Sequence, residues 1–287
     1  MTMATVTSLD RWARRIERAE ALAGKHPDAA AQLGFYEALA RWQSEVARAL
    51  EVTLPAPDER PDTPVARDEY PLLRPATLDP ELLVPFGAGL IDVLGGGPPP
   101  LAAFAALLAD EPALLRRILW AYPLGQLDLL ASDQELPAPL VEIAAQAAWQ
   151  PLLELLANRD RRIDAGNWYE AYCPFCGGAP LCSYLQQAEP RGQRMLVCSR
   201  CLYEWPFRRL RCPECGAEQD GVFSPVQAEQ YPAMRLDTCE DCHCYLKTAD
   251  ERQDGHAVAI VDDIATVALD LWAEEHGLHR PAPALVR

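Results

Sequence analysis

Four Cys-x-x-Cys pairs, all within one stretch of about seventy residues, constrain this chain more than any other feature of its sequence. They are Cys173/Cys176, Cys198/Cys201, Cys212/Cys215 and Cys239/Cys242. Two cysteines in a tight turn present two thiolates to one ion, and a second turn completes a tetrahedron around it. The stretch therefore predicts two metal sites, each with four thiolate ligands.

The spacing of the pairs predicts how they combine. Twenty-one residues separate the first pair from the second, ten the second from the third, and twenty-three the third from the fourth. This long, short, long rhythm favours two successive ribbons, each made of two metal-binding turns (knuckles) and a hairpin between them. An interleaved arrangement, the first pair with the third and the second with the fourth, is the alternative.

An internal repeat supports the two-ribbon arrangement. Cys-Pro-Phe-Cys-Gly recurs thirty-nine residues later as Cys-Pro-Glu-Cys-Gly, and two further positions recur with it. The repeated positions are the opening motif (173–177 and 212–216), an aromatic residue (Tyr184 and Phe223) and an arginine (Arg194 and Arg235). The glycine after each opening pair supplies the positive φ that such a turn requires. We interpret the two ribbons as copies of one unit.

The grouping of the cysteines and the N-terminal sequence predict a cytoplasmic protein. Eight of ten cysteines lie in metal-type pairs, which favours a reducing compartment over a disulfide scaffold. Charged residues from Arg11 to Glu20 leave no apolar core for a signal peptide, and Arg14-Arg15 lacks the apolar run of a twin-arginine signal. No uninterrupted apolar run of about eighteen residues predicts a membrane span.

The charge balance argues against polyanionic partners. Asp and Glu number 42 against 26 Lys and Arg, a net charge of −16. Nucleic acids and anionic membrane surfaces bind basic patches, so we expect neither as a partner, although zinc ribbons often occur in nucleic-acid-binding proteins.

The first 165 residues read as an all-helical domain. Apolar residues at helical spacing predict helices over 7–23, 28–52, 80–94 (interrupted), 101–108, 111–122 and 139–157, with Pro151 expected to kink or restart the last. Seven prolines between Pro55 and Pro80 predict an irregular strap over this domain, and Gly95–Pro100 predicts a turn between helices.

The remainder predicts an α+β arrangement of two tandem rubredoxin-like or zinc-ribbon modules and a C-terminal helix. We expect strands over 179–185, 194–198, 221–224, 234–238 and 256–260, and a closing helix over 262–276. Trp205–Phe207 is expected to connect and lock the ribbons. The predicted domains are 1–165 (with the strap at 55–80), 166–209, 210–255 and 256–287.

Each predicted metal site is coordinatively full. Four thiolates around a divalent ion leave no open position for substrate or activated water, which argues against hydrolytic catalysis, and no catalytic residues are predicted. Zinc would be structural, whereas iron in the same shell could take up one electron. The residues alone do not separate these metals.

Two cysteines lie outside the pairs. Cys182, in a predicted strand, is expected to be a small buried apolar residue. Cys244 follows Cys242 and His243 and is a candidate reactive thiol, since a nearby metal could lower its pKa. His243 or Cys244 could also replace Cys242 as a ligand.

The sequence Arg208, Arg209 and Arg211 is a short basic run. It favours a solvated patch, or one paired with acidic residues, over a docking site for a partner.

Several of these motifs together resemble the FdhE family, the accessory proteins of formate dehydrogenase formation. The matching segments are Leu196–Trp205, Arg211–Gly216, Cys239-Glu-Asp-Cys242, Tyr245-Leu-Lys247 and Val261–Leu271. The resemblance implies a cytoplasmic, non-enzymatic assembly factor that binds the catalytic subunit of a molybdenum-containing formate dehydrogenase before export. It also implies rubredoxin-like iron on the eight paired cysteines, so iron is favoured and zinc is the alternative. The chain departs from the family pattern at His243-Cys244.

Two other functions stay open at this point: an iron-dependent redox protein and a nucleic-acid-binding zinc-ribbon protein. The sequence also leaves homo-oligomerisation open.

Overall fold

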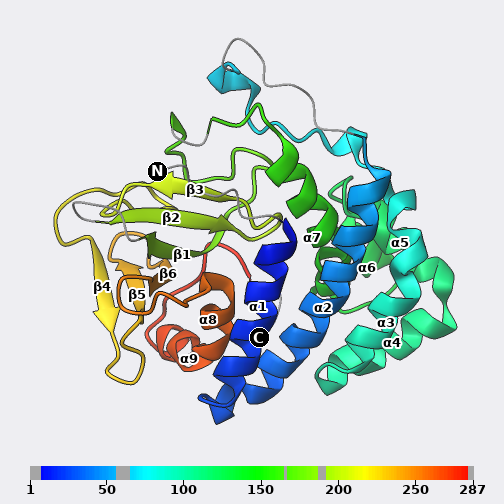
Figure 1. Ribbon diagram of the computed structural model, residues 1–287, viewed down its shortest axis with the longest axis horizontal. Helices are drawn as coiled ribbons and strands as arrows, with labels where there is room; N and C mark the ends of the chain where they lie inside the picture. Colours follow the sequence, from blue (N-terminus) through cyan, green and yellow to red (C-terminus); the bar gives the residue numbers. More distant parts are fainter. Residues whose placement is uncertain (1–7, 56–64, 165–166, 187–191, 284–287) are drawn as a thin grey trace.

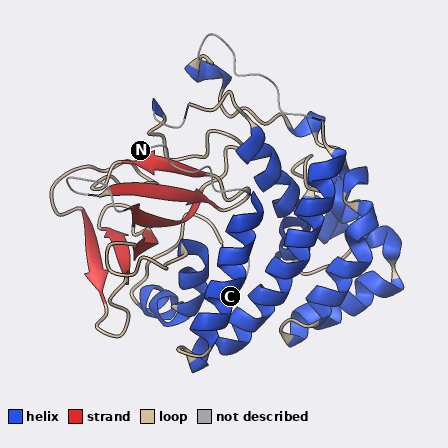
Figure 2. Ribbon diagram, in the orientation of Figure 1, coloured by secondary structure: helices blue, strands red, loops and turns tan. Residues whose placement is uncertain are grey.

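The computed structural model describes residues 8–55, 65–164, 167–186 and 192–283. Helices make up one side of the molecule and a single sheet the other, with α1 (Ser8–Ala23) and α8 (Ala259–Ala265) between them (Figures 1 and 2). This confirms the predicted α+β class, with a helical N-terminal part, a cysteine-rich sheet part and C-terminal helices.

The N-terminal helices follow the predicted periodicity closely. They are α1, α2 (Ala30–Thr53), α3 (Gly87–Gly95), α4 (Pro99–Asp110), α5 (Pro112–Ala121), α6 (Leu127–Asp133) and α7 (Ala138–Arg159). The Gly95–Pro100 turn between helices is confirmed. Helix α6 was not predicted. Of the two outcomes expected at Pro151, a kink or a restart, the restart is wrong, because α7 continues through that residue.

One apolar core runs from the helices into the sheet. Trp12 of α1, Leu39 of α2 and Trp149 of α7 are fully buried at helical spacing from other core residues. The same cluster of buried side chains includes Cys173, Cys198 and Trp205 from the ribbon region. Since apolar burial is the main favourable term in folding, the helical part and the first ribbon stabilise each other.

Part of the proline-rich strap packs on the first knuckle. The amides of Leu72 and Leu73 donate to the carbonyls of Pro174 (3.1 Å) and Phe175 (2.7 Å). Leu72 is buried. Strap residues 56–64 lie outside the described residues, while 65–80 contains short 3₁₀ turns. The described part of the strap therefore joins the helical region to the ribbons.

The two ribbons form one six-stranded sheet in the described part of the chain. Its strands are β1 (Pro180–Gln186), β2 (Gln193–Cys198), β3 (Glu204–Phe207), β4 (Phe223–Gln227), β5 (Met234–Cys239) and β6 (Tyr245–Asp250). Their order is β3-β2-β1-β6-β5-β4, so each ribbon contributes three neighbouring strands. The ribbons join through the parallel pair β1–β6, with Ser183 opposite Thr248.

Four details of the predicted second half are corrected. Trp205–Phe207 is strand β3 rather than a connection, and strand β6 was not predicted. The strand expected over 256–260 is wrong, because α8 begins there at Ala259. The closing helix is divided into α8 and α9 (Val267–Glu275), with Thr266 between them.

Candidate metal centres

All four Cys-x-x-Cys pairs adopt the same turn. In each, the amide of the residue four positions after the first cysteine donates to that cysteine's carbonyl, at 2.9 to 3.2 Å. The amide of the first cysteine in turn donates to the carbonyl of the residue five positions on. The four acceptors are Gly178, Tyr203, Ala217 and Cys244, at 2.9 to 3.0 Å. These paired bonds aim both thiols of a knuckle to one side.

The residue directly after the second cysteine of each pair has a positive φ. Gly177 (72°) and Gly216 (79°) occupy it in the two opening knuckles, as the sequence predicted. In the closing knuckles Leu202 (53°) and His243 (59°) occupy it, which the sequence analysis missed. His243 is exposed. The position that looked like a candidate ligand thus serves the backbone turn.

The structure brings the first knuckle to the second and the third to the fourth. Cluster 1 is Cys173, Cys176, Cys198 and Cys201, and cluster 2 is Cys212, Cys215, Cys239 and Cys242; within each, all four Sγ atoms lie within 4.8 Å of one another. The interleaved alternative is not the arrangement found.

Both clusters have the dimensions of a tetrathiolate metal site. In cluster 1, Sγ–Sγ distances of 3.4 to 3.6 Å separate three of the pairs. In cluster 2, Cys212 lies 3.7 Å from Cys242 and Cys215 lies 3.6 Å from Cys239. Metal–sulfur bonds of about 2.3 Å in a tetrahedron put the sulfurs roughly 3.8 Å apart. Each cluster could therefore hold one tetrahedral metal ion.

The thiols of cluster 1 illustrate why such a set favours a metal. Burial raises the pKa of Cys173 and of Cys201, whereas hydrogen bonds from its three neighbours lower the pKa of Cys176. Four thiolates cannot be buried together without a compensating positive charge, which a divalent ion supplies on binding.

The clusters differ in burial. Three of the four cysteines of cluster 1 are fully buried and belong to the main core. In cluster 2, Cys215 is exposed and Cys242 half-buried, while Cys212 and Cys239 pack in a separate small group with Phe223 and Cys244. Cluster 2 therefore lies at the periphery of the molecule and cluster 1 inside it.

Helix α7 and the strap hold cluster 1 in place. The Gln146 side-chain amide of α7 donates to the carbonyls of Ser199 (3.2 Å) and Arg200 (2.7 Å), inside the second knuckle. Its oxygen accepts from the Tyr122 hydroxyl at 2.8 Å. The first knuckle receives the strap amides described above. Both halves of cluster 1 are thus tied to the helical region.

Cys244 lies against cluster 2. Its sulfur is 3.4 Å from Cys212 Sγ and fully buried. The hydrogen bond from Cys244 lowers the pKa of Cys212 to about 4, and the same bond and burial raise the pKa of Cys244 itself. This direction is opposite to the lowered pKa that the sequence suggested for Cys244. These opposite shifts favour Cys244 as the S–H donor in this contact.

The other candidate residues have structural surroundings. Cys182 is fully buried in β1, as expected. Arg208 and Arg211 form ion pairs with Glu218, at 3.1 and 3.3 Å, which confirms the acid-paired interpretation for these two.

Two buried polar networks were not predicted. The repeated arginines Arg194 and Arg235 converge on one carboxylate, Asp237, at 3.3 and 2.9 Å. In the second network, Lys247 pairs with Asp270 (2.6 Å) and Asp263 (3.2 Å), and Arg280 pairs with both. These groups fasten α8, α9 and the C-terminal segment to β6. The repeat spacing pointed to the arginines but not to their shared partner.

Within the part of the chain that the structure describes, no helix is long and apolar enough to cross a membrane.

Comparison with known proteins gives consistent matches along the chain. Residues 172–209 match the family model described as the FdhE central domain, and 210–286 match the FdhE C-terminal domain. A Pseudomonas aeruginosa protein named Protein FdhE homolog is 32% identical over 97% of this chain and 90% of its own length. An Aquifex aeolicus protein of the same name is 37% identical over 45% of each chain, and Protein FdhE of Salmonella dublin is 32% identical over 45% of its length.

The fold is likewise similar to a solved structure. The crystal structure of the FdhE protein from Pseudomonas aeruginosa matches with a TM-score of 0.63 and 27% identity, covering 97% of this chain and 96% of that one. The helical half, which the two family models do not cover, is included in that match. Near-complete coverage in both sequence and fold decides the assignment: the chain belongs to the FdhE family.

Proposed function

We propose that this chain is a non-catalytic accessory protein for the formation of active formate dehydrogenase, and that it binds the enzyme's catalytic subunit. Membership of the FdhE family supports the first part. The observation that carries the second is the pair of closed four-cysteine clusters, each of which fills all four positions of a tetrahedral ion and leaves none open. Such sites stabilise a binding surface rather than activate a substrate.

Each cluster holds one metal ion in this proposal. Cys173, Cys176, Cys198 and Cys201 are the ligands in cluster 1, and Cys212, Cys215, Cys239 and Cys242 those in cluster 2. The ion supplies folding free energy to its ribbon and, if it is iron, can accept one electron. The resemblance to rubredoxin-like sites favours iron over zinc. An absorption spectrum with elemental analysis separates the two, because ferric tetrathiolate is coloured and zinc tetrathiolate is not.

We place the protein in the cytoplasm, where the reducing conditions keep eight metal-binding thiols from forming disulfides. A nucleic-acid partner is disfavoured by the net charge of −16 and by the pairing of Arg208 and Arg211 with Glu218.

Electron transfer is the second candidate function. The exposure of Cys215 supports it, since an exposed ligand shortens the path to a partner.

Co-purification tests the proposal. A tagged chain should retain the formate dehydrogenase catalytic subunit, and Cys212→Ala with Cys215→Ala should abolish this retention because the peripheral ribbon belongs to the docking surface. Cys182→Ala is the matched control, a cysteine outside both clusters. Failure of the unaltered chain to retain the subunit contradicts the proposed function. Full retention by a folded Cys212/Cys215 variant removes the ribbon from the docking surface.

A further inference from the structure

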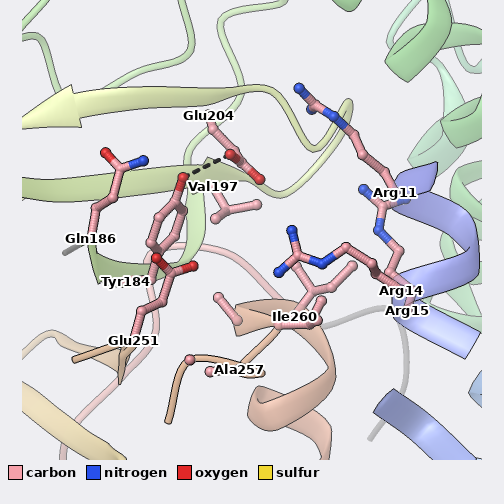
Figure 3. Close-up of a pocket in the computed structure, with 13 residues that line it drawn as sticks. Arg11, Arg14, Arg15, Tyr184, Gln186, Val197, Glu204, Glu251, Ala257 and Ile260 are labelled. Carbon is pink, nitrogen blue, oxygen red and sulfur yellow. Dashed lines mark hydrogen bonds between the residues drawn. The ribbon is translucent and has the colours of Figure 1, made fainter. Parts of the chain in front are cut away.

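A pocket of about 300 Å³ opens between α1, the sheet and the segment that leads into α8 (Figure 3). The sheet contributes Tyr184, Val197 and Glu204, and α1 contributes Arg11 and Arg14. At about 30 Å³ per water molecule, the pocket has room for roughly ten waters, or a few side chains. It is too small for a folded domain surface to enter.

The two walls carry opposite charges. Figure 3 shows Glu204 and Glu251 beside Tyr184 on one side of the pocket, and Arg11 and Arg14 projecting from α1 on the other. Three arginines, Arg11 and Arg14 among them, line this one pocket in a chain with a net charge of −16. A ligand that carried both signs of charge would find a complement on each wall.

The groups on both walls have capacity for a ligand. Arg15, the third arginine of the pocket, is committed to Glu154 through two bonds of 2.7 Å. Among the described residues, by contrast, the side chains of Arg11, Arg14 and Glu251 make no hydrogen bond or ion pair. Glu204 accepts one bond, from the Tyr184 hydroxyl at 2.7 Å, which orients its carboxylate.

The acidic wall favours a cation. Burial, and after it the charge of Glu204, raises the pKa of Glu251, and the charge of Arg14 opposes this rise. A basic group placed between the two carboxylates would relieve their mutual repulsion. This wall is specific to the first ribbon. Tyr184 lies opposite Met195, three residues before Cys198, whereas the matching position of the second ribbon, opposite Leu236, is Val226, which has no hydroxyl. Phe223, which matches Tyr184 in the sequence repeat, lies opposite Cys239 instead.

The pocket adjoins cluster 1. Val197 immediately precedes Cys198, and Glu204 follows Cys201 by three residues, so the second knuckle connects the two strands that supply these residues. A metal ion in cluster 1 would therefore fix the position of the acidic wall relative to α1.

We propose that this pocket docks a segment of the client polypeptide that carries a basic side chain and an acidic side chain a few residues apart. The basic side chain lies between Glu204 and Glu251, and the acidic one against Arg11 and Arg14. This inference rests on the proposed function, because it takes the client to be the formate dehydrogenase catalytic subunit.

Charge reversal on one wall tests the inference. Arg11→Glu with Arg14→Glu should weaken binding of the catalytic subunit about tenfold or more, since two attractive contacts become repulsive. Lys25→Glu with Arg48→Glu is the matched control: it changes the net charge equally at two exposed positions outside the pocket, and it should leave binding unchanged. Circular dichroism and metal content verify that each variant is folded.

Neutralising the acidic wall provides a second, independent test. Glu204→Gln with Glu251→Gln keeps an acceptor for Tyr184 and removes both charges, so binding should fall several-fold and lose part of its dependence on salt. Client binding that is unchanged in both pocket variants overturns the inference and leaves the proposed function standing. Native mass spectrometry that finds a small zwitterion bound stoichiometrically, with client binding intact in the Arg11/Arg14 variant, also overturns it. Absence of client binding by the unaltered chain contradicts the proposed function itself.

Discussion

The two four-cysteine clusters share one turn geometry and differ in nearly everything around it. Cluster 1 lies in the main core and is tied to α7 by Gln146 and to the strap by Leu72 and Leu73. Cluster 2 has an exposed ligand, Cys215, and a small core of its own. Duplication thus reproduces the metal-binding geometry, whereas the neighbouring elements decide what the metal stabilises. We infer that the cluster 1 ion supports the whole fold and the cluster 2 ion a local surface.

The largest expected difference follows from removing one knuckle of each cluster. Cys198→Ala with Cys201→Ala should abolish cooperative thermal unfolding, because metal-coupled folding free energy on the order of 10 kcal/mol is lost from within the core. Cys212→Ala with Cys215→Ala should release one metal ion and keep the helical signal and a cooperative transition. Calorimetry and circular dichroism measure both. Equal destabilisation by the two double variants would contradict the comparison.

The contact between helix α7 and cluster 1 should account for a smaller part of the difference in stability between the two clusters. Gln146→Ala leaves the carbonyls of Ser199 and Arg200 without their donor and should lower the free energy of unfolding by about 2 kcal/mol. The corresponding contact at cluster 2, between His279 and Glu214 at 3.0 Å, is exposed. His279→Ala should therefore change the free energy by less than about 0.5 kcal/mol. Urea unfolding measures both free energies. A larger loss from His279→Ala than from Gln146→Ala would contradict the inference that cluster 1 is the more firmly held of the two.

The sequence predicted the clusters better than the sheet that carries them. Cys-x-x-Cys spacing is a local signal, and it identified all four knuckles and their pairing. The β1–β6 pair joins distant segments, and β6 is buried at every position, so it lacks the alternation that marks a strand. At 256–260 the apolar residues suggested a strand, but the Asp262 carboxylate accepts from the Val258 amide at 2.7 Å and favours a helical turn. That partner is visible only in the fold.

Cys244 should sharpen the comparison at cluster 2. Cys244→Ala removes the S–H···S bond to Cys212 and should speed metal release from cluster 2 by about tenfold, since hydrogen bonds to charged groups contribute about 1.5 kcal/mol or more. Cys182→Ala, an equally buried cysteine, should lower stability by about 1 kcal/mol and leave both release rates unchanged. Release is followed by competition with a chromophoric chelator. Identical rates of metal release from cluster 2 in the two variants would show that Cys244 does not help to hold the ion.

The smallest expected effect concerns the fourth knuckle. His243 has a φ of 59° and an exposed side chain, so His243→Gly should stabilise the protein by about 0.5 kcal/mol through relief of left-handed strain. Thermal unfolding detects the shift, and elemental analysis should find the metal content unchanged. Loss of one ion in this variant would instead identify His243 as a ligand. Leu202→Gly, at the matching but buried position, should destabilise because its side chain packs in the core.

Stepwise metal removal tests the central claim most directly. The metal-loaded protein is titrated with a chelator while native mass spectrometry counts bound ions and circular dichroism follows the helices. We predict that the first ion leaves with the helical signal intact, that the second leaves only as the protein unfolds, and that the Cys212/Cys215 variant lacks the first step alone. Loss of both ions in one step, or unfolding with the first, would contradict the account.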